Sequence, residues 1–156
     1  MDDDILYPKD LFEKMLKCYK KMGGKNPISF GKKSSDWHIN GITINSHYGA
    51  GSVTKYKYFN NKINEIYFDT TKKRINKNIK YPDDVLYTYA ALINGYKYIR
   101  CKDYYIKSYL YINSTLAIPF SENSKKYRFL KNQYHKIIRE YIKNKYNITI
   151  IKLLKK

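Results

Sequence analysis

Apolar residues at helical spacing near the start of the chain predict an N-terminal helix packed on a core. They recur from Leu11 to Met22, after Pro8, which is favoured at the start of a helix, and before Gly23-Gly24, which ends it. The apolar positions are Leu11, Phe12, Met15, Leu16, Tyr19 and Met22. A second helical stripe runs from Val85 to Ile93, between the start signal Pro82-Asp83-Asp84 and the stop signal Asn94-Gly95.

A short β-hairpin is predicted around Asn40-Gly41, the strongest two-residue turn signal. Its strands are Trp37-His38-Ile39 and Ile42-Thr43-Ile44. The turn pairs Ile39 with Ile42 and Trp37 with Ile44, which places these four side chains on one face, toward the core.

Further segments are predicted as strands from their β-branched and aromatic content. Val53–Phe59 and Ile63–Asp69 form a second hairpin around Asn60-Asn61. The remaining predicted strands are Tyr96–Cys101, Tyr104–Ile112 and Asn147–Leu154.

The longest predicted helix lies near the C-terminus and begins at Ser121 or Ser124, either of which can cap it. Its apolar stripe is Tyr127, Leu130, Tyr134, Ile137 and Tyr141, with Ile138 beside it, and its opposite face carries Lys125, Arg128, Lys136, Arg139 and Lys143. Together the elements predict a single α+β domain with a mostly antiparallel sheet, an N-terminal helix and a long basic C-terminal helix.

Net charge adds a prediction about the partner. The chain has 31 Lys and Arg residues against 13 Asp and Glu, a formal net charge of +18 on 156 residues, and it has 19 Tyr. A chain this basic is attracted to polyanions, and phosphate contacts gain affinity by releasing condensed counterions. The leading prediction is therefore binding of nucleic acid, RNA or DNA, through backbone phosphates. Because Arg is rare and bidentate reading of guanine favours Arg, we expect low sequence specificity.

Codon usage offers another explanation of the same composition. Lys, Asn, Ile and Tyr all have codons built entirely from A and T, so an AT-rich genome produces this abundance without selection for binding. Large DNA viruses, phages and low-GC bacteria have such genomes. The charge is therefore either a binding device or a product of the genome.

The candidate interface combines a predicted basic loop over residues 71–80, TKKRINKNIK, with the outer face of the C-terminal helix. Several cations presented together are what phosphate binding requires, and tyrosine rings among lysines can stack on unpaired bases. The candidate nucleic-acid-binding residues are Lys72, Lys73, Arg74, Lys77, Lys125, Arg128, Lys136, Arg139, Lys143, Tyr56 and Tyr58.

A second hypothesis is enzymatic, a small toxin-like ribonuclease that needs no metal. His38 and His47 fall on one face of the predicted sheet and could act as acid and base, with Asp36 orienting the imidazole of His47. A flat sheet would hold the two histidines on the order of 13 Å apart, too far for the mechanism, although a bulge could shorten the gap. No metal ligand set and no cofactor motif is predicted.

A third hypothesis is a non-catalytic interaction protein, such as a viral or phage antagonist of a host defence, that binds an acidic protein surface. No membrane association is expected, because no apolar run approaches the ~20 residues that span a bilayer. The start, MDDDILYPKD, is acidic, which is unlike a secretory or organellar signal. Cys18 and Cys101 lack CxxC spacing and are expected to be reduced and buried, which favours the cytoplasm or nucleus. The oligomeric state is left open.

Overall fold

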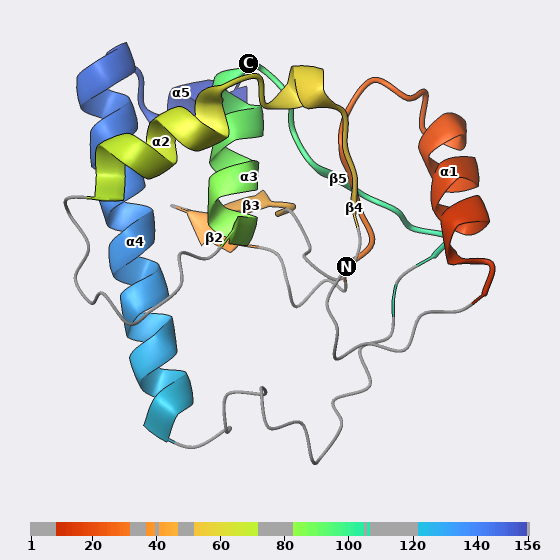
Figure 1. Ribbon diagram of the computed structural model, residues 1–156, viewed down its shortest axis with the longest axis horizontal. Helices are drawn as coiled ribbons and strands as arrows, with labels where there is room; N and C mark the ends of the chain where they lie inside the picture. Colours follow the sequence, from red (N-terminus) through yellow and green to blue (C-terminus); the bar gives the residue numbers. More distant parts are fainter. Residues whose placement is uncertain are drawn as a thin grey trace.

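The structure is a computed structural model of the chain, and it describes residues 9–31, 37–39, 41–46, 52–71, 83–104, 106 and 122–155. Its α-helices are α1 (Leu11–Lys21), α2 (Lys62–Thr71), α3 (Asp83–Ile93), α4 (Glu122–Tyr146) and α5 (Ile150–Lys155). Its strands are β1 (Ile28–Ser29), β2 (Trp37–Ile39), β3 (Ile42–Ile44), β4 (Ser52–Val53) and β5 (Ile99–Arg100), and a 3-10 helix, η2, covers Tyr56–Tyr58. These helices and small sheets form the α+β domain that the sequence predicts (Figure 1).

The strands form two small sheets. In the first, β2 pairs antiparallel with β3 in the predicted register, with Trp37 opposite Ile44 and His38 opposite Thr43. Gly41 in the turn has a φ of 77°, a left-handed conformation that glycine adopts without steric cost. In the second sheet β1 lies in the centre, antiparallel to β4 and parallel to β5.

Helices α1 and α3 form where the apolar pattern predicts them. Gly23 and Gly24, with φ of 81° and 60°, follow α1, and Gly95 with a φ of 80° follows α3. One part of the prediction for α1 is wrong: Phe12 and Leu16 are 63% and 51% exposed. The helix buries a narrower stripe against the small sheet, made of Leu11, Met15, Cys18 and Tyr19.

The predicted second hairpin is wrong, because its first strand is reduced to Ser52–Val53 and α2 replaces its second strand. Asn60 has a φ of 47°, but the turn it makes leads into a helix. The β-branched and aromatic residues of this segment also recur at helical spacing, and Ile66 and Thr70 are fully buried. Tertiary burial of that stripe outweighs the local β propensity.

The C-terminal segment was also predicted as a strand, and it is the short helix α5. Its Ile150 and Leu153 are three residues apart and both buried, a spacing that a strand would place on opposite faces. Between Tyr96 and Cys101 only Ile99–Arg100 is a strand. The predicted strand over Tyr104–Ile112 lies largely outside the described residues.

Two hydrophobic clusters hold the domain together. The larger lies among α2, α3, α4, α5 and the β2–β3 hairpin, and the smaller lies between α1 and the β4–β1–β5 sheet. Figure 1 shows α1 on one side of that sheet and the other helices beyond it, with α4 extending past the end of α3. In the described ranges no helix combines the length and the apolar character needed to cross a membrane.

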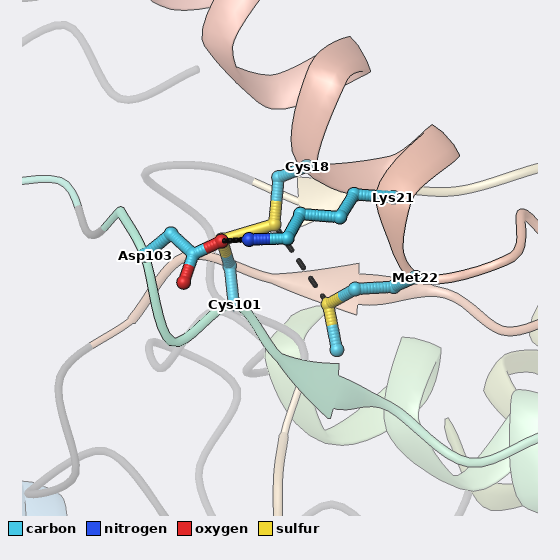
Figure 2. Close-up of a disulfide and its surroundings, with 5 residues drawn as sticks. All are labelled: Cys18, Lys21, Met22, Cys101 and Asp103. Carbon is cyan, nitrogen blue, oxygen red and sulfur yellow. Dashed lines mark hydrogen bonds and ion pairs between the residues drawn. A yellow bond between two sulfur atoms is a disulfide. The ribbon is translucent and has the colours of Figure 1, made fainter.

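A disulfide joins Cys18 of α1 to Cys101, just after β5, which corrects the expectation of reduced cysteines. The two residues are 83 positions apart in sequence, and both are buried. Figure 2 shows its surroundings: the sulfur of Met22 lies 3.7 Å from that of Cys18, and Lys21 pairs with Asp103 at 2.6 Å. The sequence could not reveal this bond, because two cysteines so far apart in the chain carry no spacing pattern that predicts a disulfide. Disulfides are rare in reducing compartments, so the cysteines no longer favour the cytoplasm or nucleus.

Candidate nucleic-acid interface

The outer face of α4 carries a row of basic side chains. Lys125, Lys136 and Lys143 are exposed, and Arg139 is partly exposed. At about 100° per residue the four positions fall within about 60° of one another around the helix. We refer to these four residues as the α4 outer stripe.

The opposite face of α4 packs into the larger hydrophobic cluster and fixes the direction of the outer stripe. Its buried residues recur at spacings of three and four, and they are Tyr134, Ile138, Tyr141 and Ile142. Ile138 and Ile142 have no exposed surface. Because this buried face cannot rotate outward without opening the core, the basic side chains stay on the solvent side.

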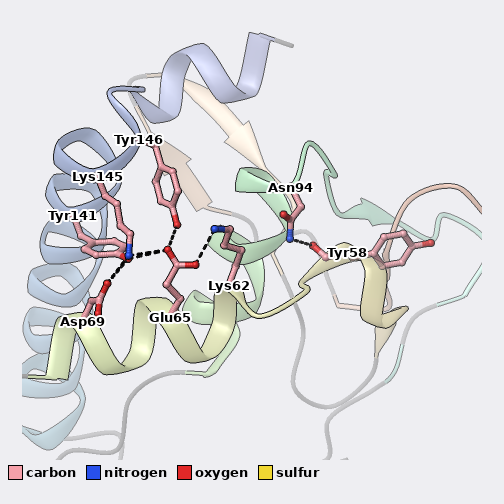
Figure 3. Close-up of polar contacts among 8 residues, drawn as sticks. All are labelled: Tyr58, Lys62, Glu65, Asp69, Asn94, Tyr141, Lys145 and Tyr146. Atoms are coloured by element: carbon pink, nitrogen blue, oxygen red, sulfur yellow. Dashed lines mark hydrogen bonds and ion pairs between the residues drawn. The ribbon is translucent and has the colours of Figure 1, made fainter.

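A polar network then anchors α4 to α2 (Figure 3). Lys145 Nζ lies 2.8 Å from Glu65 Oε1 and 2.7 Å from Asp69 Oδ2. The Tyr141 hydroxyl donates a hydrogen bond to Asp69 at 2.7 Å, and the Tyr146 hydroxyl donates one to Glu65 at 2.5 Å. The two carboxylates, one helical turn apart on α2, are thus held by three side chains of α4.

Ionisation of Glu65 is strongly favoured by this network. Burial alone would raise the pKa of Glu65, but hydrogen bonds from Lys145, Lys62 and Tyr146 outweigh it and lower that pKa to about 2. Hydrogen bonds to Asp69 and then to Glu65 raise the pKa of Lys145. A permanently ionised, lysine-paired carboxylate is a poor proton shuttle at neutral pH. The network therefore serves to position α4.

Other carboxylates of the described residues are also paired away from the outer stripe. Asp10 binds Lys14 at 2.8 Å on α1, and Asp84 of α3 binds Lys131 of α4 at 2.5 Å. No ion pair joins the outer stripe to any described acidic side chain. Among the described side chains of α4, its acidic neighbour on the exposed side is Glu140. The stripe therefore keeps a largely uncompensated positive charge.

The third histidine of the chain, His135, was not predicted as part of any site. It is 9% exposed on α4, its Nδ1 lies 3.2 Å from the Tyr89 hydroxyl, and the ring of Trp37 packs edge-on against it at 4.3 Å. Burial, together with the charges of Lys131 and Arg139, lowers the pKa of His135 to about 3. Its position, three residues before Ile138 on the apolar side of α4, was the available signal. His135 is a neutral core residue that joins α4, α3 and the hairpin.

The catalytic candidates are not brought together by the described residues. His38 is exposed on β2, and its Nδ1 lies 3.3 Å from the hydroxyl of Thr43, its predicted cross-strand partner. Asp36 and His47 lie outside the described residues, so the proposed acid–base pair has no geometry here.

The predicted binding residues fall into three groups. Lys125, Lys136, Arg139 and Lys143 come together on the outer stripe. Lys72, Lys73, Arg74 and Lys77 lie outside the described residues, as does the side chain of Arg128, whose backbone is part of α4. The tyrosines separate: Tyr56 is 71% exposed with its hydroxyl on Asn61, whereas Tyr58 is fully buried. The 3-10 helix turns the Tyr58 side chain into the core, where an alternating strand would have placed it beside Tyr56 on one face. Its buried ring therefore cannot stack on a base.

No metal site is assembled by the described side chains, since no three of His, Cys, Asp and Glu are grouped closely enough to bind an ion. Comparison with known proteins adds no relative: no family model matches the chain, and no curated protein or solved structure matches it significantly.

Proposed function

We propose that the protein binds nucleic acid through backbone phosphates, with α4 as the main contact surface. One observation carries the proposal: the α4 outer stripe remains positively charged while Glu65, Asp69 and Asp84 are neutralised elsewhere by lysines. Lysines presented in a row along a rigid helix match a regularly charged polyanion, and each phosphate contact releases a condensed counterion.

Low sequence specificity follows from the chemistry of the stripe. Three of its four cations are lysines, which act as point charges and read no base pattern. Arg139 alone could contact a guanine edge in a bidentate manner, and part of its surface is already covered. We therefore expect affinities for unrelated sequences of equal length to differ little.

The test is a charge reversal of the stripe with a matched control. The variant K125E/K136E/K143E changes three exposed lysines of α4, and the control K17E/K20E/K102E changes three exposed lysines near α1. Each Lys→Glu change lowers the formal net charge by two, so both variants move it from +18 to +12. Binding to single-stranded RNA, single-stranded DNA and duplex DNA is measured across a salt series in EDTA.

We expect the stripe variant to lose affinity and about 0.7 to 0.9 units of salt slope for each phosphate contact removed. The control variant should retain most of both. Equal losses in the two variants would mean that net charge alone attracts the polyanion, and no loss in the stripe variant would refute the assignment. RNA cleavage in EDTA would favour the ribonuclease hypothesis. Absence of binding at physiological salt would favour an acidic protein partner or codon usage.

A further inference from the structure

We infer that α4 prefers single-stranded nucleic acid, because an exposed phenylalanine lies within its basic surface. This inference rests on the proposed function and specifies its ligand. Phe129 is 59% exposed on α4. The described part of the chain has few large apolar side chains this exposed, and Phe129 is the one on the basic helix.

Helical geometry places the ring of Phe129 among the cations. Its position lies about 40° from Lys125 and about 20° from Lys136 around the helix. Along the axis it lies about 6 Å from Lys125 and about 10 Å from Lys136. Asn132, also exposed, lies between Phe129 and Lys136 on the same side. An aromatic face and two flanking cations therefore share one continuous strip of surface.

Such a strip fits an unpaired nucleotide better than a base pair. The lysines can hold phosphates on either side while the exposed ring offers a flat apolar face to a base. In a duplex the bases are already stacked on one another and closed to a side chain from outside. The ring would thus add affinity for a single strand and little for a duplex, whereas the lysines serve both.

Charge complementarity also argues against other occupants of this surface. A second copy of the chain would bring its own +18 charge against the same lysines. Among the described side chains of α4, the nearest carboxylate is Glu140, about 16 Å along the axis from Phe129. None of the described side chains of α4 therefore places a carboxylate beside the ring.

Phe68 of α2 is a natural control. It is 67% exposed, similar to Phe129, but its neighbour on the helix is Asp69 and the residues one turn earlier are Asn64 and Glu65. The nearby cation Lys145 is already paired with Glu65 and Asp69, so this exposed ring should add nothing to nucleic-acid binding. Comparison of the two positions separates base stacking from a general effect of surface hydrophobicity.

The experiment compares F129L, F129Y and F68L with the unaltered protein. The ligands are oligodeoxythymidine, oligouridine and a duplex DNA, all of 20 nucleotides or base pairs. Leu keeps the apolar volume but removes the flat ring, and Tyr retains the ring. We expect F129L to weaken binding of both single strands about fivefold or more, the range expected for one stacked base, with the duplex affinity and the salt slope unchanged. F129Y and F68L should bind like the unaltered protein.

Equal weakening for single strands and duplex, or no weakening in F129L, would overturn the inference. If F68L has the same effect as F129L, the stacking assignment is likewise wrong. The failure of the proposed function is distinct, because it appears as intact binding in K125E/K136E/K143E. The two single-stranded ligands also separate DNA from RNA: a preference for one of them that F129L removes would assign the ring to that ligand.

Discussion

The hydroxyl oxygens of Tyr19 and Tyr58 lie 2.5 Å apart, and this hydrogen bond joins the two hydrophobic clusters of the domain. Tyr19 donates its own proton to the carbonyl oxygen of Gly24, so Tyr58 is the donor in the pair. Burial raises the pKa of Tyr58, and the hydrogen bond to Tyr19 adds to that effect, so the Tyr58 ring remains neutral at physiological pH.

The direction of the bond predicts unequal effects of removing each hydroxyl. Y58F removes a donor and leaves the bond from Tyr19 to Gly24 intact, which should cost about 1 kcal/mol of unfolding free energy. Y19F leaves the fully buried hydroxyl of Tyr58 without an acceptor and should cost more, about 2 to 3 kcal/mol. Urea unfolding of the two variants measures the difference. Equal costs would show that the assigned direction is wrong.

The Cys18–Cys101 bond should contribute strongly to stability because it closes a long loop. Cross-linking residues 83 positions apart restricts the unfolded chain, and the double variant C18A/C101A should lose about 3 kcal/mol. Unfolding midpoints with and without reductant provide the same comparison in the unaltered protein, and reductant should have no effect on the double variant.

The state of the cysteines in cells tests the location of the protein. Alkylation of freshly lysed cells without reductant, followed by mass spectrometry, should leave both cysteines unmodified if the disulfide forms there. Modification of both cysteines would show that they are reduced in the cell, and would again favour a cytoplasmic or nuclear location. With the disulfide formed, the cysteines give that location no support.

Glu65 should make the domain sensitive to strong acid. The pKa of this carboxyl is about 2 in the folded protein against an ordinary value of 4.5, so the unfolded chain binds the proton more readily. Stability is therefore fully present above about pH 4.5 and is lost as the pH falls toward 2. E65Q should be less stable at pH 7 and should lose less stability over this window.

Glu140 supplies the control for Glu65. It is exposed on α4, and none of the ion pairs between described residues involves it. E140Q should therefore keep the stability at pH 7 and the acid dependence of the unaltered protein. Denaturant unfolding at pH 7, 4.5 and 3 distinguishes the variants, and an unchanged acid limb in E65Q would rule out the assignment.

His135 should extend the pH dependence to milder acid. Burial, with the charges of Lys131 and Arg139, holds the pKa of His135 at about 3 instead of 6.5, so only the unfolded chain takes up its proton between these values. Stability should fall from about pH 6.5 downward, by as much as about 4 kcal/mol at pH 3.

The variant H135N keeps a polar group near Tyr89 but cannot be protonated in this range. We expect it to flatten the stability profile between pH 6.5 and 4.5, where Glu65 contributes little. H38N removes an exposed histidine and should follow the unaltered profile. If H135N retains the full slope in this window, another group is responsible for it.

Local signals were sufficient for the elements whose ends are marked chemically. Asn40-Gly41 predicted the β2–β3 hairpin with its register, and the glycines after α1 and α3 predicted where these helices end. Such signals work because a left-handed backbone conformation excludes most side chains, and that restriction acts within a few residues.

Burial decided the elements that the sequence mispredicted. The segments of α2 and α5 are rich in β-branched residues, yet both are helices because Ile66, Ile150 and Leu153 reach the core only at helical spacing. The same cause exposes Phe12 on α1 and buries Tyr58. Which side of an apolar stripe becomes core depends on the neighbouring elements, and these come from distant parts of the chain.

For the candidate site, the sequence by itself determined the chemistry: an excess of lysine, few arginines and a basic helical face near the C-terminus. Only the tertiary structure decided which carboxylates neutralise which lysines, because Glu65–Lys145 and Asp84–Lys131 are pairs between residues far apart in sequence. The disulfide and the burial of His135 were decided in the same way. Charge is a property of composition, whereas compensation of charge depends on distances that only the folded chain creates.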